Sequence, residues 1–80
     1  MKILDFWAPW CGPCKMLAPI LDSLDIEVTK VNVDEDPKEA ERWGVRALPT
    51  VLVLSDAGEV VETLVGSGAT RDRILRAVGR

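Results

Sequence analysis

The sequence predicts an α/β fold in which a mixed four-stranded sheet carries helices on both faces. Apolar and β-branched runs alternate with segments of helical spacing, in the order β-α-β-α-β-β-α. A helix joins the first two strands, which should therefore lie parallel through a right-handed crossover. The last two strands flank Asp56-Ala57-Gly58, a turn that favours an antiparallel hairpin.

Length and composition are those of one small globular domain, which we take to span residues 1–80. The chain is 48% hydrophobic and 29% charged, with a net charge of −3. Acidic and basic residues are mixed along the chain and form no basic stripe. Nucleic acid is therefore not expected as a partner. Because no apolar stretch approaches a membrane span or a signal-peptide core, we expect no membrane partner and a cytoplasmic protein.

The first strand and helix surround the two cysteines. Apart from Asp5, residues 3–8 are apolar at odd and even positions alike, as in a strand buried on both faces. Pro13 suits the first turn of the next helix. The apolar face of that helix continues to about Leu24.

Caps and turns set the remaining elements. Residues 26–33 are rich in β-branched side chains and predict the second strand. Asp36 should cap a short helix, with Pro37 in its first turn, Glu39 completing a capping box and Gly44 as its left-handed end. The other expected elements are strands at 51–54 and 60–65 and a helix between Thr70 and Gly79.

Cys11 and Cys14 are the only cysteines, and they lie three positions apart at a strand-to-helix turn. This spacing is typical of a thiol–disulfide redox site. Two alternatives are an inert thiol pair and half of a zinc site. Zinc needs about four ligands, and the chain has neither histidine nor a third cysteine, so no metal is expected.

The two cysteines should differ in reactivity. Cys11 precedes the helix and faces its unpaired N–H groups and positive dipole end, which favour a thiolate. Cys14 lies about one turn further inside. We therefore predict that Cys11 attacks a substrate disulfide and that Cys14 resolves the mixed disulfide.

Asp5 and Lys30 are two charged residues within predicted strands. A carboxylate between Leu4 and Phe6 would be desolvated, which raises its pKa. From the residues alone, a surface position on a frayed first strand is an equal alternative for Asp5. An edge or snorkelling lysine is an equal alternative for Lys30.

Several blocks of the chain resemble the thioredoxin family. Residues 5–15, Asp-Phe-Trp-Ala-Pro-Trp-Cys-Gly-Pro-Cys-Lys, closely resemble the active-site segment of that family. Further blocks follow in the family's order at 18–21, 31–34, 44–50, 58–59 and 65–66. The resemblance covers nearly the whole chain. It implies a minimal thioredoxin fold, a short form without the N-terminal strand and helix that the family normally carries.

The resemblance implies that Asp5 lies behind the cysteines and exchanges a proton with Cys14, with Lys30 close by. Trp7 is expected in the core, and Asp34 near the substrate groove.

The resemblance also implies a cis bond between Leu48 and Pro49, which would offer the Leu48 backbone to an extended substrate. An ordinary trans turn is the alternative. The residues expected to bind substrate are Trp10, Gly12, Pro13, Leu48, Pro49 and Gly66.

The function that follows is reduction of disulfides in protein partners through a reversible Cys11–Cys14 pair. Electrons would come from an external thioredoxin reductase, because the chain has no nucleotide fingerprint and thus no cofactor of its own. A monomer is expected. One alternative is a glutaredoxin-like protein that uses glutathione, although glutaredoxins usually carry a tyrosine between the cysteines. The other is a non-catalytic binding subunit that uses the groove around Trp10, Pro49 and Gly66.

Overall fold

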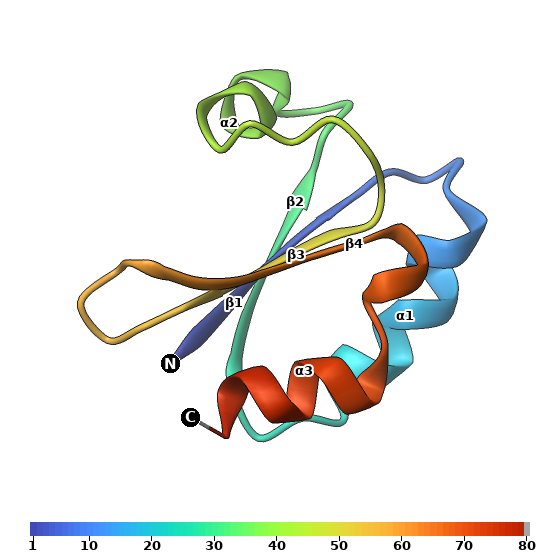
Figure 1. Cartoon of the computed structure of the whole chain (residues 1–80). Helices are drawn as coiled ribbons and strands as arrows, with labels where there is room; N and C mark the ends of the chain where they lie inside the picture. The colour runs from blue at the N-terminus through green and yellow to red at the C-terminus, as the bar shows by residue number, and fades with distance from the viewer. Residues whose placement is uncertain (80) are drawn as a thin grey trace.

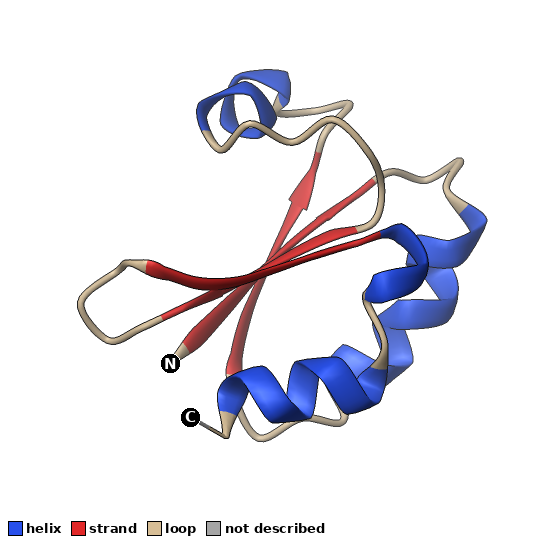
Figure 2. Cartoon of the chain, in the orientation of Figure 1, coloured by secondary structure: helices blue, strands red, loops and turns tan. Residues whose placement is uncertain are grey.

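The computed structural model describes residues 1–79, and their elements follow the predicted order (Figures 1 and 2). The elements are β1 (Lys2–Trp7), α1 (Gly12–Asp22), β2 (Glu27–Asn32), α2 (Pro37–Arg42), β3 (Thr50–Leu54), β4 (Val60–Val65), the 3-10 turn η1 (Gly66–Gly68) and α3 (Arg71–Val78). The predicted fold class is confirmed. Within residues 1–79, no helix combines the length and the apolar character needed to cross a bilayer.

The sheet has the spatial order β2-β1-β3-β4. β1 lies parallel to β2 and antiparallel to β3, and β3 lies antiparallel to β4. β1 and β3 are therefore central, whereas β2 and β4 are the edges. In this register Asp5 of β1 lies between Lys30 of β2 and Val51 of β3. The sheet itself thus places the lysine next to the aspartate.

Helices α1 and α3 cover one face of the sheet (Figure 1). The buried side chains on this face come from three strands and both helices. They are Ile3, Leu17, Leu21, Val51, Val53, Leu64, Ile74 and Ala77. Burial of this apolar layer, at roughly 25 cal/mol per Å², holds α1 against the sheet and fixes where its first turn lies.

The opposite face carries α2, which lies near one end of the sheet in Figure 1. Its core is smaller and consists of Leu4, Phe6, Leu52 and Leu54. Ala40 and Trp43, in and directly after α2, pack against this cluster together with Leu48. The loop that holds Leu48 is thereby fastened to the sheet.

Two helix ends differ from the sequence prediction. The first helix was expected to reach Leu24, but α1 ends at Asp22 because Ser23 caps it. The Ser23 hydroxyl donates to the Ile20 carbonyl at 2.7 Å. At the start of α2, Asp36 accepts a bond from the Glu39 N–H as predicted. The prediction that Glu39 completes the capping box is wrong, since its carboxylate instead accepts a hydrogen bond from Trp43 Nε1 at 2.8 Å.

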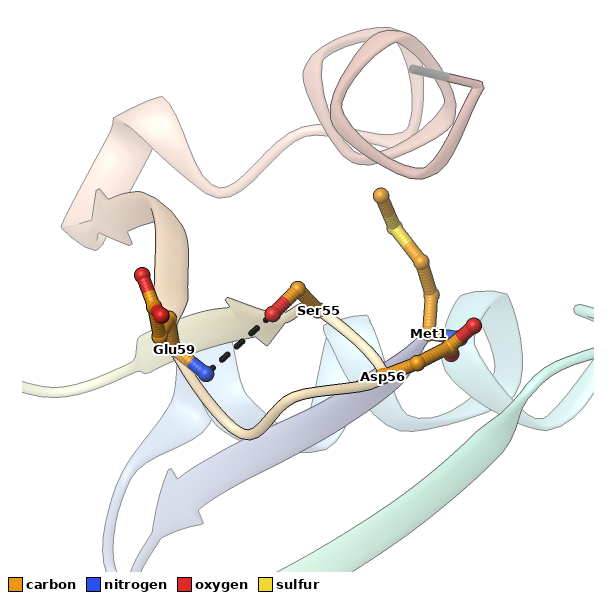
Figure 3. A network of polar contacts seen from close by, with 4 residues as sticks. All are labelled: Met1, Ser55, Asp56 and Glu59. Atoms are coloured by element: carbon orange, nitrogen blue, oxygen red, sulfur yellow. Dashed lines mark hydrogen bonds and ion pairs between the residues drawn. The ribbon is translucent and has the colours of Figure 1, made fainter.

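The β3–β4 hairpin lies at the end of the sheet away from the cysteines. Ser55 Oγ accepts from the Glu59 N–H at 3.2 Å (Figure 3). Gly58 adopts a φ of +84°, a conformation that favours glycine. The N-terminal ammonium of Met1 forms an ion pair with Asp56 in this turn, and its hydrogen bond lowers the pKa of that carboxyl. These contacts fix the beginning of β1 beside the hairpin.

Candidate active site

Cys11 and Cys14 form a disulfide where β1 passes into α1, with their Cα atoms 5.3 Å apart. Cys11 is the N-cap of α1, and its Sγ accepts a hydrogen bond from the Cys14 N–H at 3.2 Å. The Cys11 N–H donates to the Ala8 carbonyl at 3.1 Å. The local backbone therefore directs an N–H of the first helical turn at the sulfur of Cys11.

Both cysteines are nearly covered, with 5% of Cys11 and 2% of Cys14 exposed. This small difference does not by itself make one thiol more reactive. The difference lies in the cap position, because Cys11 Sγ receives the Cys14 N–H and lies at the positive end of the helix dipole.

A small cavity of about 110 Å³ lies behind Cys14. It is lined by Asp5, Trp7, Cys14, Lys15, Ala18 and Lys30. Asp5 is only 2% exposed, which excludes the frayed-strand alternative. Trp7 was expected in the core, but it is half-buried because it lines this cavity near the edge strand β2.

Burial raises the pKa of Asp5 from an ordinary 3.8 to about 6. The positive charge of Lys30 opposes this rise in pKa, and the negative charge of Asp22 adds to it. Among the residues that the structure describes, none gives Asp5 Oδ1 a hydrogen bond. Such a carboxyl can exchange a proton near neutral pH.

Lys30 lies beside Asp5 in the sheet register, but its ammonium forms an ion pair elsewhere. Its Nζ donates to Asp22 Oδ1 at 2.9 Å, at the end of α1. Lys30 is thus both the edge lysine and the neighbour of Asp5 that the sequence analysis considered.

A larger groove of about 320 Å³ lies on the other side of the first turn of α1. The Leu48–Pro49 bond at its side is cis, and the Pro49 carbonyl accepts from the Gly66 N–H at 2.8 Å. Its lining combines three predicted substrate residues with a run of apolar and small ones: Pro13, Met16, Leu17, Ile20, Pro49, Gly66, Ser67, Ala69, Thr70 and Arg71.

The other three predicted substrate residues lie outside this groove. Trp10 is 69% exposed, and its Nε1 donates to Asp34 Oδ2 at 3.0 Å. Leu48 packs against the cluster of Ala8 and the two cysteines. Gly12 begins α1, with open space where a Cβ would lie.

Two residues beside the site were not predicted from the sequence. Met16 is 77% exposed and lines the groove, and Asp22 holds Lys30. The signal for Asp22 was its spacing, since Cys14, Ala18 and Asp22 recur every four residues along one row of a helix. Within residues 1–79, no three potential metal-ligating side chains cluster.

Comparison with known proteins places the chain in a family. The model of the family described as Thioredoxin matches residues 1–80. A thioredoxin of Bacillus subtilis is 54% identical over 70 residues, which are 80% of this chain and 66% of that protein. A thioredoxin of Chlamydia caviae is 42% identical over 85 residues, with 100% of this chain and 81% of that protein covered.

Solved structures give the same result. Mitochondrial thioredoxin 3 of Saccharomyces cerevisiae, in its oxidised form, superposes with a TM-score of 0.84 at 34% identity. The match covers 98% of this chain and 76% of that one. This chain spans only about two thirds of several curated relatives, such as 65% of thioredoxin 1 from Synechococcus elongatus. The whole-chain match and these identities show that the chain belongs to the thioredoxin family.

Proposed function

We propose that this chain is a thiol–disulfide oxidoreductase that reduces disulfides in protein partners, and that residues 1–80 act as one domain. The observation that carries the proposal is the Cys11–Cys14 disulfide itself, at the start of a helix. A cavity lined by the titratable Asp5 lies behind it, and an open groove lies beside it. A single staple across so short a loop would add little stability, which favours a chemical role.

The reaction begins with the reduced pair. The Cys11 thiolate, stabilised by the N-terminus of α1, attacks one sulfur of the substrate disulfide. A bond forms between Cys11 and that sulfur, the substrate S–S bond breaks, and the second substrate sulfur leaves as a thiolate. An extended substrate segment pairs with the Leu48 backbone beside Pro49 and occupies the groove near Pro13 and Gly66.

Cys14 completes the reaction. Asp5 accepts its proton across the small cavity, directly or through water, and the Cys14 thiolate attacks Cys11 Sγ. The mixed disulfide breaks and its substrate sulfur leaves as a thiolate. The substrate has gained two electrons and becomes a dithiol when its two sulfurs take protons from solvent, while the Cys11–Cys14 pair has lost two electrons and is a disulfide. With a pKa of about 6, Asp5 is ionised in most molecules at neutral pH and able to act as the base.

An external reductase returns the two electrons. We propose a thioredoxin reductase as this partner, a cytoplasmic setting in which thiols are kept reduced, and action as a monomer. Support comes from the family and from a pair of thiols suited to cycling rather than to permanent cross-linking. Size-exclusion chromatography with light scattering measures the molar mass in solution, which should be the 8.8 kDa of one chain.

The test is an insulin-reduction assay with three electron sources: dithiothreitol, NADPH with a thioredoxin reductase, and NADPH with glutathione and glutathione reductase. Turnover is expected with the first two, and Cys11→Ser serves as the inactive control. Turnover only with glutathione would move the assignment to the glutaredoxin-like alternative. No turnover with any source, with biological activity retained in the Cys11→Ser/Cys14→Ser protein, would favour the binding-subunit alternative.

A further inference from the structure

The ion pair between Lys30 and Asp22 lies directly beside the proton-exchanging carboxyl. Lys30 is the parallel-strand neighbour of Asp5, and its side chain lines the same cavity. Its Nζ nevertheless contacts Asp22 Oδ1 at 2.9 Å, whereas Asp5 Oδ1 accepts no hydrogen bond from the residues described. The ammonium therefore lies close to Asp5 without binding it.

The position of Asp22 follows from the row of helix residues that faces the cavity. Cys14 and Ala18 line the cavity from α1, and Asp22 is the next residue in that row, in the last turn of the helix. It thus reaches the solvent side of Lys30, where 38% of Lys30 and 62% of Asp22 are exposed.

We propose that Asp22 is a positioning residue, which draws the Lys30 ammonium toward solvent and so leaves the Asp5 carboxylate free to exchange a proton with Cys14. This inference rests on the proposed function. It adds a residue outside the bond-making and proton-transfer steps proposed above.

The physical reason is that a direct ion pair would disable the base. A lysine bonded to a buried carboxylate strongly favours its ionised form and lowers its proton affinity. The charged and titratable groups around Asp5 are Lys30 on β2 and Cys14, Lys15 and Asp22 on α1, while its β3 neighbour Val51 is apolar. Asp22 acts on Asp5 in two ways that agree in sign. It holds Lys30 away, and it adds a negative charge of its own.

The test is a titration of Asp5 in the oxidised protein, followed by the NMR signal of its ¹³C-labelled carboxyl and assigned with Asp5→Asn. Asp22→Asn should lower the midpoint by about half a pH unit, since exposed ion pairs are weak. Lys30→Met should raise it. Asp25→Asn, which removes the same charge from an exposed residue three positions along, should leave it unchanged.

The Lys30→Met background separates positioning from simple charge repulsion. If Asp22 acts through Lys30, adding Asp22→Asn to Lys30→Met should shift the midpoint by less than half of its effect in the unmodified protein. An equal shift in both backgrounds, or no shift in either, would overturn the proposal.

A kinetic readout uses single-turnover decay of a mixed disulfide on Cys11 across a pH series. Asp22→Asn should move the acid-side inflection downward by the same amount as the NMR midpoint, and an unmoved inflection would contradict the proposal. The NMR titration needs no catalytic activity. It therefore tests the position of Lys30 even if the chain proves unable to reduce disulfides.

Discussion

The two cavities beside the disulfide differ in size, composition and charge. The cavity behind Cys14 measures about 110 Å³ and contains a buried carboxyl with a lysine at its edge. The groove beside Pro13 measures about 320 Å³ and is lined mainly by apolar and small residues. Pro13 and Cys14 are consecutive residues, so one helical turn directs neighbouring side chains into two unlike environments.

Two cavities are needed because proton exchange and substrate binding require opposite environments. A base with a raised pKa must be kept from water, whereas a groove for varied protein partners must be open to it. Variants behind Cys14 should therefore change pH dependence and stability, and variants in the groove should change KM.

The largest expected effect lies at the disulfide itself. Cys11→Ser removes the attacking sulfur and should reduce insulin turnover to the background rate. Cys14→Ser leaves the attack intact but removes the resolving sulfur, so a covalent adduct should accumulate on Cys11. Mass spectrometry under non-reducing conditions measures the adduct. Accumulation on Cys11→Ser instead would reverse the two roles.

The next largest effect is the stability cost of the buried carboxyl. Because the folded-state pKa of Asp5 is about 6 and its ordinary value is 3.8, the folded protein retains a proton that the unfolded chain releases. The free energy of unfolding therefore falls as pH rises from about 4 to 6. Above that range the buried, ionised Asp5 makes it lower by roughly 3 kcal/mol.

Asp5→Asn should remove this cost. Urea unfolding at pH 7.5 should show a free energy of unfolding higher by up to about 3 kcal/mol, and the gain should shrink toward zero near pH 4. The same variant should slow resolution of the mixed disulfide about tenfold or more near neutral pH, because the base is gone. A pH-independent gain in stability would mean that Asp5 does not titrate in this window.

Met16 tests the groove side. Met16→Glu places a charge on an exposed apolar part of the groove and should raise KM for insulin about fivefold, which corresponds to roughly 1 kcal/mol of lost binding, with kcat retained. Met16→Leu, similar in volume and polarity, is the control and should keep the original KM. A change in kcat without a change in KM would place Met16 outside substrate recognition.

Local signals predicted most of the fold. The fourth strand was predicted at the observed Val60–Val65 because a turn and a glycine bound it closely. The end of α1 was missed, since it depends on Ser23, whose hydroxyl competes for a helix carbonyl in a way that apolar periodicity cannot show. The Glu39 contact was missed because Trp43, one turn later, is an equally near partner.

The site was predictable where one short segment forms it and less so where segments meet. The Cys11–Cys14 pair follows from local spacing. The pairing of Lys30 with Asp22 depends on the register of two strands and on the rotation of α1 above them. The four-residue spacing places Asp22 in the row of Cys14 and Ala18, but no local pattern shows that Lys30 lies opposite this row.

The smallest expected effect concerns Trp10, which lies outside both cavities. Trp10→Phe keeps an aromatic ring but removes the indole N–H that bonds Asp34 Oδ2 at 3.0 Å. Trp43→Phe is a matched control, since it removes an indole bond to Glu39 on the α2 face of the sheet. Each variant should lose no more than about 1 kcal/mol of stability. If Trp10 forms the rim of the substrate site, only its variant should raise KM for insulin, by about twofold, because the phenyl ring that replaces the indole is no longer held by Asp34 and is free to turn away from the cysteines. Equal KM values for the two variants would confine recognition to the groove of Pro13, Pro49 and Gly66.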